Sequence, residues 1–260
     1  MLVDLALPVN KVRITNDQIK RYSGQINLKK ISITGQKKII DSKILIIGLG
    51  GLGTPALTYL ARSGVGCFGI ADPDKVSISN LHRQILYDQK DLKKSKAEVS
   101  KKKILLTNPK IKIKIFKSKI TKNNIDKIAK DYDVILDGTD SFISKLTISD
   151  YCKKNKKILI CSAINKFLGY LFVFNFKEKQ KKSPCLKCFM PKAPSNDNND
   201  CESEGIVGSI AGIMGVLMCN ETIKEILNFK ESLCGKILIV DLEKTTFRTI
   251  NLHKNCHNHL

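Results

Sequence analysis

The feature that most constrains the fold is the segment KILIIGLGGLG at residues 43–53, where an apolar run enters a glycine-rich turn. Gly48, Gly50 and Gly53 have the spacing GxGxxG, which is typical of a strand-to-helix turn that approaches phosphates closely. Asp72 ends the next apolar run, at the place where a carboxylate would accept hydrogen bonds from ribose hydroxyls. The segment therefore predicts the first unit of a nucleotide-binding α/β fold.

Apolar runs alternate with helical patterns after this turn, which predicts a Rossmann-like, doubly wound and mainly parallel sheet. The expected strands are 43–47, 67–71, 111–116, 134–136 and 158–161, and the expected helices are 51–63, 92–106, 123–130 and 141–154. The pattern then changes to a strand at 169–176, a polar loop at 191–200, a helix at 206–228 and a closing hairpin at 237–241 and 246–252. We therefore expect antiparallel strands at the C-terminal end.

The chain has 260 residues and a formal net charge of +21. Its lysines are scattered along the whole length and are not interleaved with stacking aromatics, so we do not expect nucleic-acid binding. The longest apolar run, 206–219, is too short to span a bilayer, and residues 1–10 do not resemble a signal peptide. These features, with nine cysteines that form no regular framework, predict a cytoplasmic protein with reduced thiols.

Three later motifs point to a nucleotide whose phosphates are attacked. SNLHRQ at 79–84 places Asn80 and Arg83 in a loop after the second strand, where a guanidinium can bind phosphate oxygens. Lys96 adds a further cation, although it is one of many lysines. Asp137 and Asp140, in DGTDS at 137–141, follow another strand, and two carboxylates at that edge could hold magnesium.

Two pairs of metal-ligating residues have the same spacing. Cys185 and Cys188 form a CxxC pair, and Cys256 and His259 repeat the two-residue gap near the end of the chain. Four such side chains suit a tetrahedral structural zinc, which would have no open position for catalysis. His257 is the weaker competitor for the fourth ligand because it directly follows Cys256. The sequence predicts a zinc knuckle.

The combined motifs GLGGLGTPALTYLARSGVG, DPDKVSISNLHRQ, SKAE and DGTDS resemble the ThiF/MoeB branch of the ubiquitin-activating-enzyme-like superfamily. The resemblance extends from about residue 21 to the C-terminus and includes the opening RYSGQINL. It implies one adenylation domain over 1–260, with an N-terminal helical segment at 1–42 and a nucleotide-binding core at 43–165. Residues 166–260 would bind the carrier and contain the zinc.

The resemblance implies an adenylyltransferase that uses ATP and magnesium to activate the C-terminal carboxylate of a small ubiquitin-like sulfur carrier ending in Gly-Gly. Its expected role is in thiamine or molybdenum cofactor biosynthesis, as a homodimer. Sulfur would come from a separate donor, a cysteine desulfurase or a rhodanese-like protein. The resemblance implies that the ATP-binding residues are Gly48, Gly50, Gly51, Gly53, Asp72, Asn80, Arg83, Gln84, Lys96 and Asp140. Among these, it implies a catalytic role for Arg83, Lys96 and Asp140, and a magnesium-binding role for Asp140.

Two positions qualify this implication. Relatives usually open with RYSRQ, and the second arginine reaches the partner subunit's nucleotide, whereas this chain has Gly24 there. Arg21 or Lys20 could substitute for it. Cys201, at the end of the polar loop, occupies a place where some relatives form a sulfur link with the carrier and others do not need the thiol. Cys201 is therefore an optional catalytic candidate.

Three other functions compete with this interpretation. A nicotinamide-dependent oxidoreductase would explain the glycines and Asp72, but not Arg83, Asp140 or the paired cysteines. A non-catalytic zinc-stabilised module would not need Arg83, Lys96 and Asp140 together. A related enzyme that activates another substrate, such as a tRNA base, would suit the positive charge.

Overall fold

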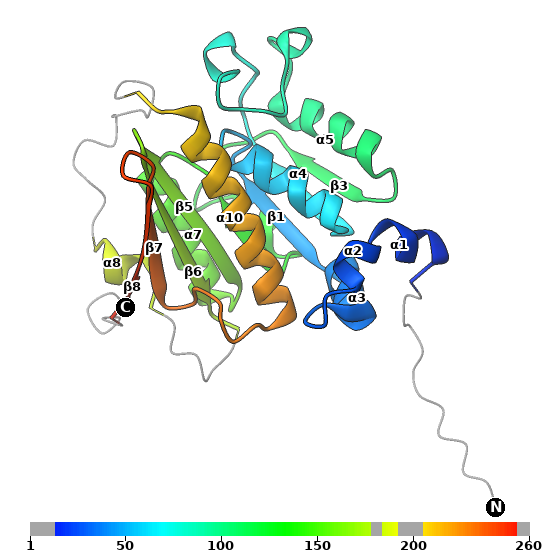
Figure 1. Ribbon diagram of the computed structural model, residues 1–260. Coiled ribbons are helices and arrows are strands. Elements are labelled where there is room, and N and C mark those ends of the chain that lie inside the picture. Colours follow the sequence, from blue (N-terminus) through cyan, green and yellow to red (C-terminus); the bar gives the residue numbers. More distant parts are fainter. Residues whose placement is uncertain (1–13, 178–183, 192–204, 254–260) are drawn as a thin grey trace, which may run out of the picture.

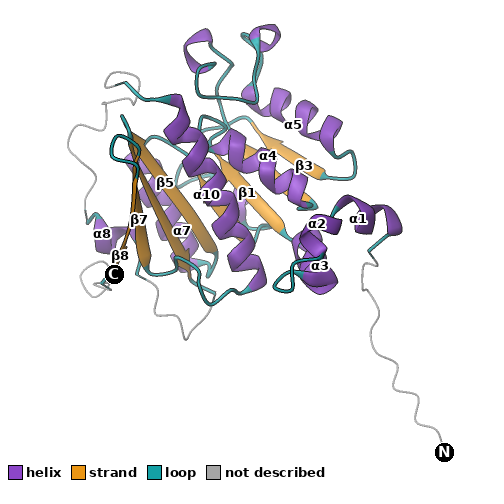
Figure 2. Ribbon diagram, viewed as in Figure 1, coloured by secondary structure: helices purple, strands orange, loops and turns teal. Residues whose placement is uncertain are grey.

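The computed structural model describes residues 14–177, 184–191 and 205–253. They form one eight-stranded sheet with helices on both faces (Figures 1 and 2). The strands are β1 (Lys43–Ile47), β2 (Cys67–Ala71), β3 (Lys112–Phe116), β4 (Val134–Asp137), β5 (Ile158–Asn165), β6 (Leu168–Asn175), β7 (Lys236–Asp241) and β8 (Thr246–Asn251). The helices are α1 (Asn16–Arg21), α2 (Ser23–Ile26), α3 (Ser32–Asp41), α4 (Gly53–Ser63), α5 (Lys96–Thr107), α6 (Ile125–Ala129), α7 (Phe142–Lys154), α8 (Leu186–Phe189) and α10 (Gly208–Leu227), with short 3-10 turns at Ile78–Asn80 and Gln89–Asp91.

The strand order is β3-β2-β1-β4-β5-β6-β7-β8. The first five of these strands in space are parallel, and β6, β7 and β8 extend the same sheet by antiparallel pairing. This confirms the predicted α/β sheet with antiparallel strands at its C-terminal end. The order reverses between β1 and β4, and ligands of such sheets bind at the carboxyl ends of the strands at this switch point.

The element boundaries follow the apolar runs closely, with two larger exceptions. The expected strand at 158–161 continues as β5 to Asn165, because each of its eight residues pairs with β6 in a long hairpin. The expected helix at 92–106 begins only at Lys96, since Lys93 has a φ of +65° that no α-helix accommodates. Long-range pairing and a local backbone bend therefore account for the differences.

Each face of the sheet has its own apolar core. The long helix α10 packs on α4, β5 and β6 in front of the sheet as drawn in Figure 1. Helices α6, α7 and α8 cover the other face, where Phe172 and Phe174 of β6 are buried. A strand covered on both sides becomes uniformly apolar, which is why β1 reads as a continuous run instead of an alternating one.

Candidate nucleotide site

The glycine turn joins β1 to α4 at the switch point of the sheet. Gly48 has a φ of +87°, and a Cβ at this position would lie 2.8 Å from the Gly138 carbonyl oxygen. A Cβ on Gly53 would lie 1.9 Å from the Gly48 carbonyl oxygen. These two glycines are therefore required by the turn and by its contact with the loop after β4, whether or not a ligand is bound.

Gly50 and Gly51 differ in what surrounds them. A Cβ on Gly51 would lie 2.8 Å from the Ala211 Cβ of α10 and 3.4 Å from the Arg83 side chain, so packing excludes a side chain there. A Cβ on Gly50 would meet only the Gln84 amide, at an ordinary 3.7 Å. Protein packing alone does not demand glycine at position 50. The bare backbone of Gly50 is thus where the turn is open to an approaching phosphate.

Asp72, at the end of β2, ties the glycine turn to the next loop. Its Oδ2 accepts a hydrogen bond from the Leu49 amide at 2.7 Å, and its Oδ1 accepts one from the Asp74 amide at 2.8 Å. Burial raises the pKa of the Asp72 carboxyl above its usual value, although the Leu49 amide and the Lys96 ammonium partly oppose the shift. Asp72 therefore also shapes the site, a role that the sequence analysis did not assign to it.

Lys96 is the first residue of α5, and its side chain is buried although lysines are usually exposed. Its Nζ forms an ion pair with Asp74 Oδ2 at 3.1 Å beside the turn. Tyr87 fixes the start of α5 because its hydroxyl donates to the Leu49 carbonyl at 2.9 Å and meets the Ser100 hydroxyl at 3.0 Å. A lone tyrosine after SNLHRQ carries no sequence signal, so the sequence analysis missed Tyr87.

The SNLHRQ loop lies against the N-terminal end of α10. Asn80 is buried, and its Nδ2 donates to the Ser79 hydroxyl at 3.3 Å. The Arg83 guanidinium donates to the Ser79 carbonyl at 3.1 Å and lies 2.7 Å from the imidazole Nε2 of His82. The same Arg83 packs beside Gly51, so the loop and the glycine turn form one wall.

Gln84 ends this loop with its side chain only 3% exposed. Its Oε1 is buried and has no hydrogen-bond partner among the described residues. A buried amide oxygen without a partner costs about 1–3 kcal/mol, and this one belongs to a side chain that faces Gly50. A bound group that brings an N–H or O–H donor would relieve this cost, so the orphaned oxygen fits a ligand site.

The DGTDS turn follows β4 and adjoins the glycine turn. Asp140 is exposed there, as a magnesium ligand must be before the metal binds. Asp137 is fully buried, and it accepts hydrogen bonds from the Thr139 amide and hydroxyl and lies 3.5 Å from Lys145 Nζ. The expectation that Asp137 could share magnesium with Asp140 is therefore wrong, because the Asp137 carboxylate is fully buried and already paired with the Lys145 ammonium.

The remaining predicted site residues lie elsewhere. Cys185 and Cys188 flank the start of α8 beside α7, where the Leu186 amide donates to the Ser149 hydroxyl at 3.3 Å. Within residues 14–177, 184–191 and 205–253, no group of three or more His, Cys, Asp or Glu side chains is arranged to hold a metal ion. The other predicted zinc ligands, Cys256 and His259, and the candidate Cys201 lie outside the described residues.

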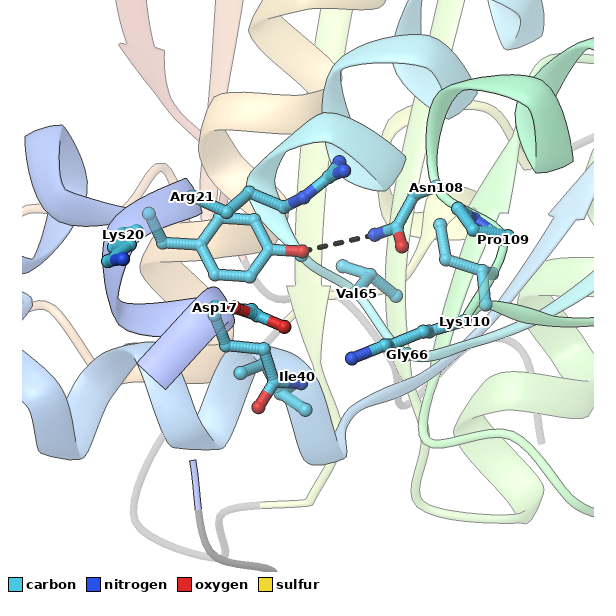
Figure 3. A pocket seen from close by; sticks show the side chains of 13 residues that line it. Asp17, Lys20, Arg21, Ile40, Val65, Gly66, Asn108, Pro109 and Lys110 are labelled. Carbon is cyan, nitrogen blue, oxygen red and sulfur yellow. Dashed lines mark hydrogen bonds between the residues drawn. The ribbon is translucent and has the colours of Figure 1, made fainter. Parts of the chain in front are cut away.

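A cavity of about 380 Å³ lies at the opposite, amino-terminal edge of the sheet (Figure 3). Arg21 and Lys20 line it, and the Arg21 guanidinium donates to the Thr107 carbonyl at 3.0 Å. Asn108 forms one wall and donates to the Tyr22 hydroxyl at 3.0 Å. Arg21 and Lys20 are thus not part of the nucleotide site of their own chain.

Residues 22–259 match the protein family described as the ThiF family. The chain belongs to the ThiF family. The match includes the whole glycine turn, the SNLHRQ loop and the DGTDS turn. The resemblance inferred from the motifs is therefore confirmed.

Relatives of this ThiF-family chain include a protein of Porphyra purpurea named a probable molybdopterin-synthase adenylyltransferase, with 42% identity over 85% of this chain and 58% of that protein. A protein of the same name from Gracilaria tenuistipitata var. liui is 36% identical over 92% of this chain and 68% of its own length. The adenylyltransferase and sulfurtransferase MOCS3 of Culex quinquefasciatus is 34% identical over 92% of this chain and 54% of its own length. The chain thus spans little more than half of two of these relatives.

Solved structures show the same fold. Escherichia coli MccB with ATP aligns with a TM-score of 0.77 at 21% identity, over 90% of this chain and 72% of that one. A structure of PaaA aligns with the same TM-score and identity, over 97% of this chain and 78% of that one. Among the described residues, no helix has both the length and the apolar character needed to cross a bilayer.

Proposed function

We propose that this ThiF-family chain adenylylates the C-terminal carboxylate of a small ubiquitin-like sulfur carrier ending in Gly-Gly, and that it consumes ATP and releases pyrophosphate. The observation that carries the proposal is the convergence of two turns at the switch point, with the open backbone of Gly50 beside the Gln84 side chain, whose amide oxygen has no partner among the described residues. Arg83 and Lys96 supply fixed positive charge beside them. The adenylyltransferase names of the relatives favour this reaction over hydride transfer.

The chemistry needs positioning and charge more than a protein nucleophile. A carboxylate oxygen of the carrier forms a bond to the α-phosphorus, and the bond from that phosphorus to the bridging oxygen of pyrophosphate breaks. Negative charge therefore builds on the departing pyrophosphate, where Arg83 and Lys96 stabilise it. Asp72 and Gln84 bind the sugar side of the nucleotide, since both present oxygen acceptors.

Magnesium fits this site through Asp140, the exposed carboxylate of the DGTDS turn. When bound, the ion neutralises phosphate charge. Asp140 itself must be held close to the glycine turn for that purpose, and the contact between Gly48 and the Gly138 carbonyl supports such a position. Cys201 has no part in adenylylation under this proposal, because the attack on ATP requires no thiol.

The names of the relatives favour the molybdenum cofactor pathway over thiamine biosynthesis. We propose a cysteine desulfurase or a rhodanese-like protein as the sulfur donor, and residues 166–260 as the part that contains the carrier-binding surface. An activated tRNA base as the substrate has no support from these names. A cytoplasmic location and the absence of nucleic-acid binding stay predictions from the sequence.

A structural zinc also belongs to the proposal. Two thiolates on a tetrahedral zinc, each about 2.3 Å from the metal, are about 3.8 Å apart. The Cys185 and Cys188 sulfurs are 3.8 Å apart before any metal is placed. This spacing fits two adjacent ligands of one tetrahedral ion.

The path of the chain supports the same zinc site. The Leu252 amide donates to the Gly235 carbonyl at 2.9 Å, and a Cβ on Gly235 would lie 3.7 Å from Pro184. Leu252 also packs in the same apolar cluster as Leu186. Cys256 follows Leu252 by four residues, which span at most about 14 Å. The chain thus leaves β8 close to Pro184, which precedes Cys185, as the proposed site requires.

A homodimer would bring the N-terminal segment of one chain to the nucleotide site of its partner, as the ThiF resemblance implies. Gly24 stands where relatives carry the arginine that makes this contact. We expect Gly24→Arg to raise the adenylylation rate without loss of stability. A Cβ at this exposed position meets no atom within 4 Å, and arginine has a higher helix propensity than glycine. Exchange assays and thermal melts check this, and an unchanged or lower rate would count against the trans contact.

Carrier-dependent exchange of labelled pyrophosphate into ATP tests the proposed function. We expect exchange with a Gly-Gly carrier and none with the same carrier lacking its final glycine, because the shortened carboxylate cannot reach the α-phosphate. Tight NAD binding together with no exchange for any Gly-Gly carrier would overturn the proposal in favour of the oxidoreductase.

A further inference from the structure

Three polar side chains are buried together beneath the DGTDS turn. Lys145 of α7, Asp137 of β4 and Cys161 of β5 come from separate elements, and the Lys145 side chain is only 4% exposed. Lys145 Nζ donates to the Ser162 carbonyl at 2.7 Å and lies 3.5 Å from Asp137 Oδ2. The Cys161 thiol donates to the same Asp137 oxygen at 3.4 Å. The sequence analysis assigned no role to Lys145 or to Cys161.

The other oxygen of Asp137 organises the turn above it. Oδ1 accepts hydrogen bonds from the Thr139 amide at 2.9 Å and from the Thr139 hydroxyl at 2.7 Å. The backbone of this turn closes on the glycine turn, since a Cβ on Gly48 would lie 2.8 Å from the Gly138 oxygen and 3.1 Å from the Thr139 nitrogen. Asp140 is the next residue. One carboxylate therefore connects a buried cation below with the nucleotide site above.

The charges of this cluster depend on one another. Burial alone would lower the pKa of the Lys145 ammonium, but the neighbouring Asp137 carboxylate raises that pKa above its usual value. Burial raises the pKa of the Cys161 thiol, which therefore stays protonated and can donate to Asp137. A buried charge is costly without a partner, and the Lys145 ammonium is the cation that pairs with the Asp137 carboxylate.

The stability of the folded chain does not by itself explain the buried ion pair of Lys145 and Asp137. Replacing a buried ion pair by apolar side chains of similar volume is often neutral or stabilising, whereas removing one partner is strongly destabilising. One oxygen of the Asp137 carboxylate accepts both hydrogen bonds from Thr139. The negative charge of Asp137 therefore stabilises the conformation of the turn. The lysine supplies the counter-charge at a position that solvent does not reach.

We infer that Lys145 is a positioning residue for nucleotidyl transfer, which pairs with the buried Asp137 carboxylate and thereby holds the turn that carries Asp140 against the glycine turn. The inference rests on the proposed function. The Lys145 side chain contacts the DGTDS turn at Asp137 and acts through that carboxylate. A displacement of the turn would move Asp140 relative to the phosphates, and a misplacement of about 1 Å can cost about 10²-fold in rate.

The test compares Lys145→Met, which keeps the length of the side chain, with the double variant Lys145→Met/Asp137→Asn. In carrier-dependent pyrophosphate exchange we expect Lys145→Met to lower kcat about 10²-fold and to raise the magnesium concentration needed for half-maximal rate. The double variant should recover at least about tenfold of that loss, because a neutral amide needs no counter-charge and its oxygen still accepts from Thr139. Circular dichroism establishes the folded fraction of each variant.

Lys157→Met is the matched control. Lys157 Nζ also donates to backbone carbonyls, those of Lys130 and Tyr132, but it lies away from the DGTDS turn. It should lose stability without a change in kcat or in magnesium dependence. Parent-like kcat in folded Lys145→Met, or an equal loss in Lys157→Met, would overturn the inference. If Lys145→Met does not fold, a folded double variant without exchange would overturn it, and one with exchange would support it. Absence of exchange in the parent chain would instead refute the proposed function.

Discussion

Arg83→Ala is expected to lower carrier-dependent pyrophosphate exchange by about 10²- to 10³-fold, or about 2.7–4 kcal/mol of transition-state stabilisation. The Arg83 Cγ packs beside Gly51, and the Ser79 carbonyl and the His82 ring contact the guanidinium, so the side chain is oriented before substrate arrives. Charge on the departing pyrophosphate develops only in the transition state. The loss should therefore appear in kcat more than in the KM for ATP.

Arg62→Ala is the matched control for this prediction. Arg62 lies exposed in the last turn of α4, so its removal should leave the exchange rate unchanged. Asp140→Ala should reproduce the loss seen for Arg83→Ala. Asp72→Ala should behave differently, because it also releases the Leu49 and Asp74 amides and so raises the KM for ATP while lowering stability. Equal kcat values for Arg83→Ala and the parent would show that Arg83 does not act on the phosphates.

Cys185→Ser is expected to remove bound zinc and to lower the melting temperature. Metal analysis of the parent should give about one zinc per chain, as four-ligand sites do. Structural zinc contributes on the order of 10 kcal/mol in zinc-finger peptides. Even a loss of about 3 kcal/mol would lower Tm by roughly 6–12 °C in a chain of this size. The ATP affinity should change less, because Cys185 lies next to Leu186, which contacts Ser149 in the middle of α7 and not the glycine turn.

Cys67→Ser controls for the loss of a partly buried thiol that lies away from the knuckle. Its melting temperature should fall less, and its zinc content should equal that of the parent. A parent protein that is free of zinc and melts at the same temperature as Cys185→Ser would contradict the zinc assignment.

The sequence predicted the strands well because the apolar runs of β1 and β2 are bounded by glycines and by Asp72. It also predicted which residues meet at the sheet edge, since GxGxxG, SNLHRQ and DGTDS follow strands whose carboxyl ends must lie together. In the folded chain, the order of the parallel strands places the switch point between β1 and β4, where these motifs meet.

The sequence could not predict which polar groups are already used by the protein. Asp137 and Asp140 look equivalent in DGTDS, but Asp137 faces a lysine that lies eight residues away on α7. Tyr87 reaches the Leu49 carbonyl across 38 residues, and Cys161 reaches Asp137 across 24. Such partners depend on tertiary packing, which no local pattern encodes.

The most direct test of the central claim is the intact mass of the carrier after incubation with this chain and ATP in the presence of magnesium. We predict that a Gly-Gly carrier gains the mass of one adenylyl group, and that hydroxylamine removes it because an acyl-phosphate bond is labile to that nucleophile. The carrier without its final glycine should stay unmodified, as should the Gly-Gly carrier incubated with Asp140→Ala. An unmodified Gly-Gly carrier in the presence of the folded, ATP-bound parent chain would contradict the assignment of this site to carrier adenylylation.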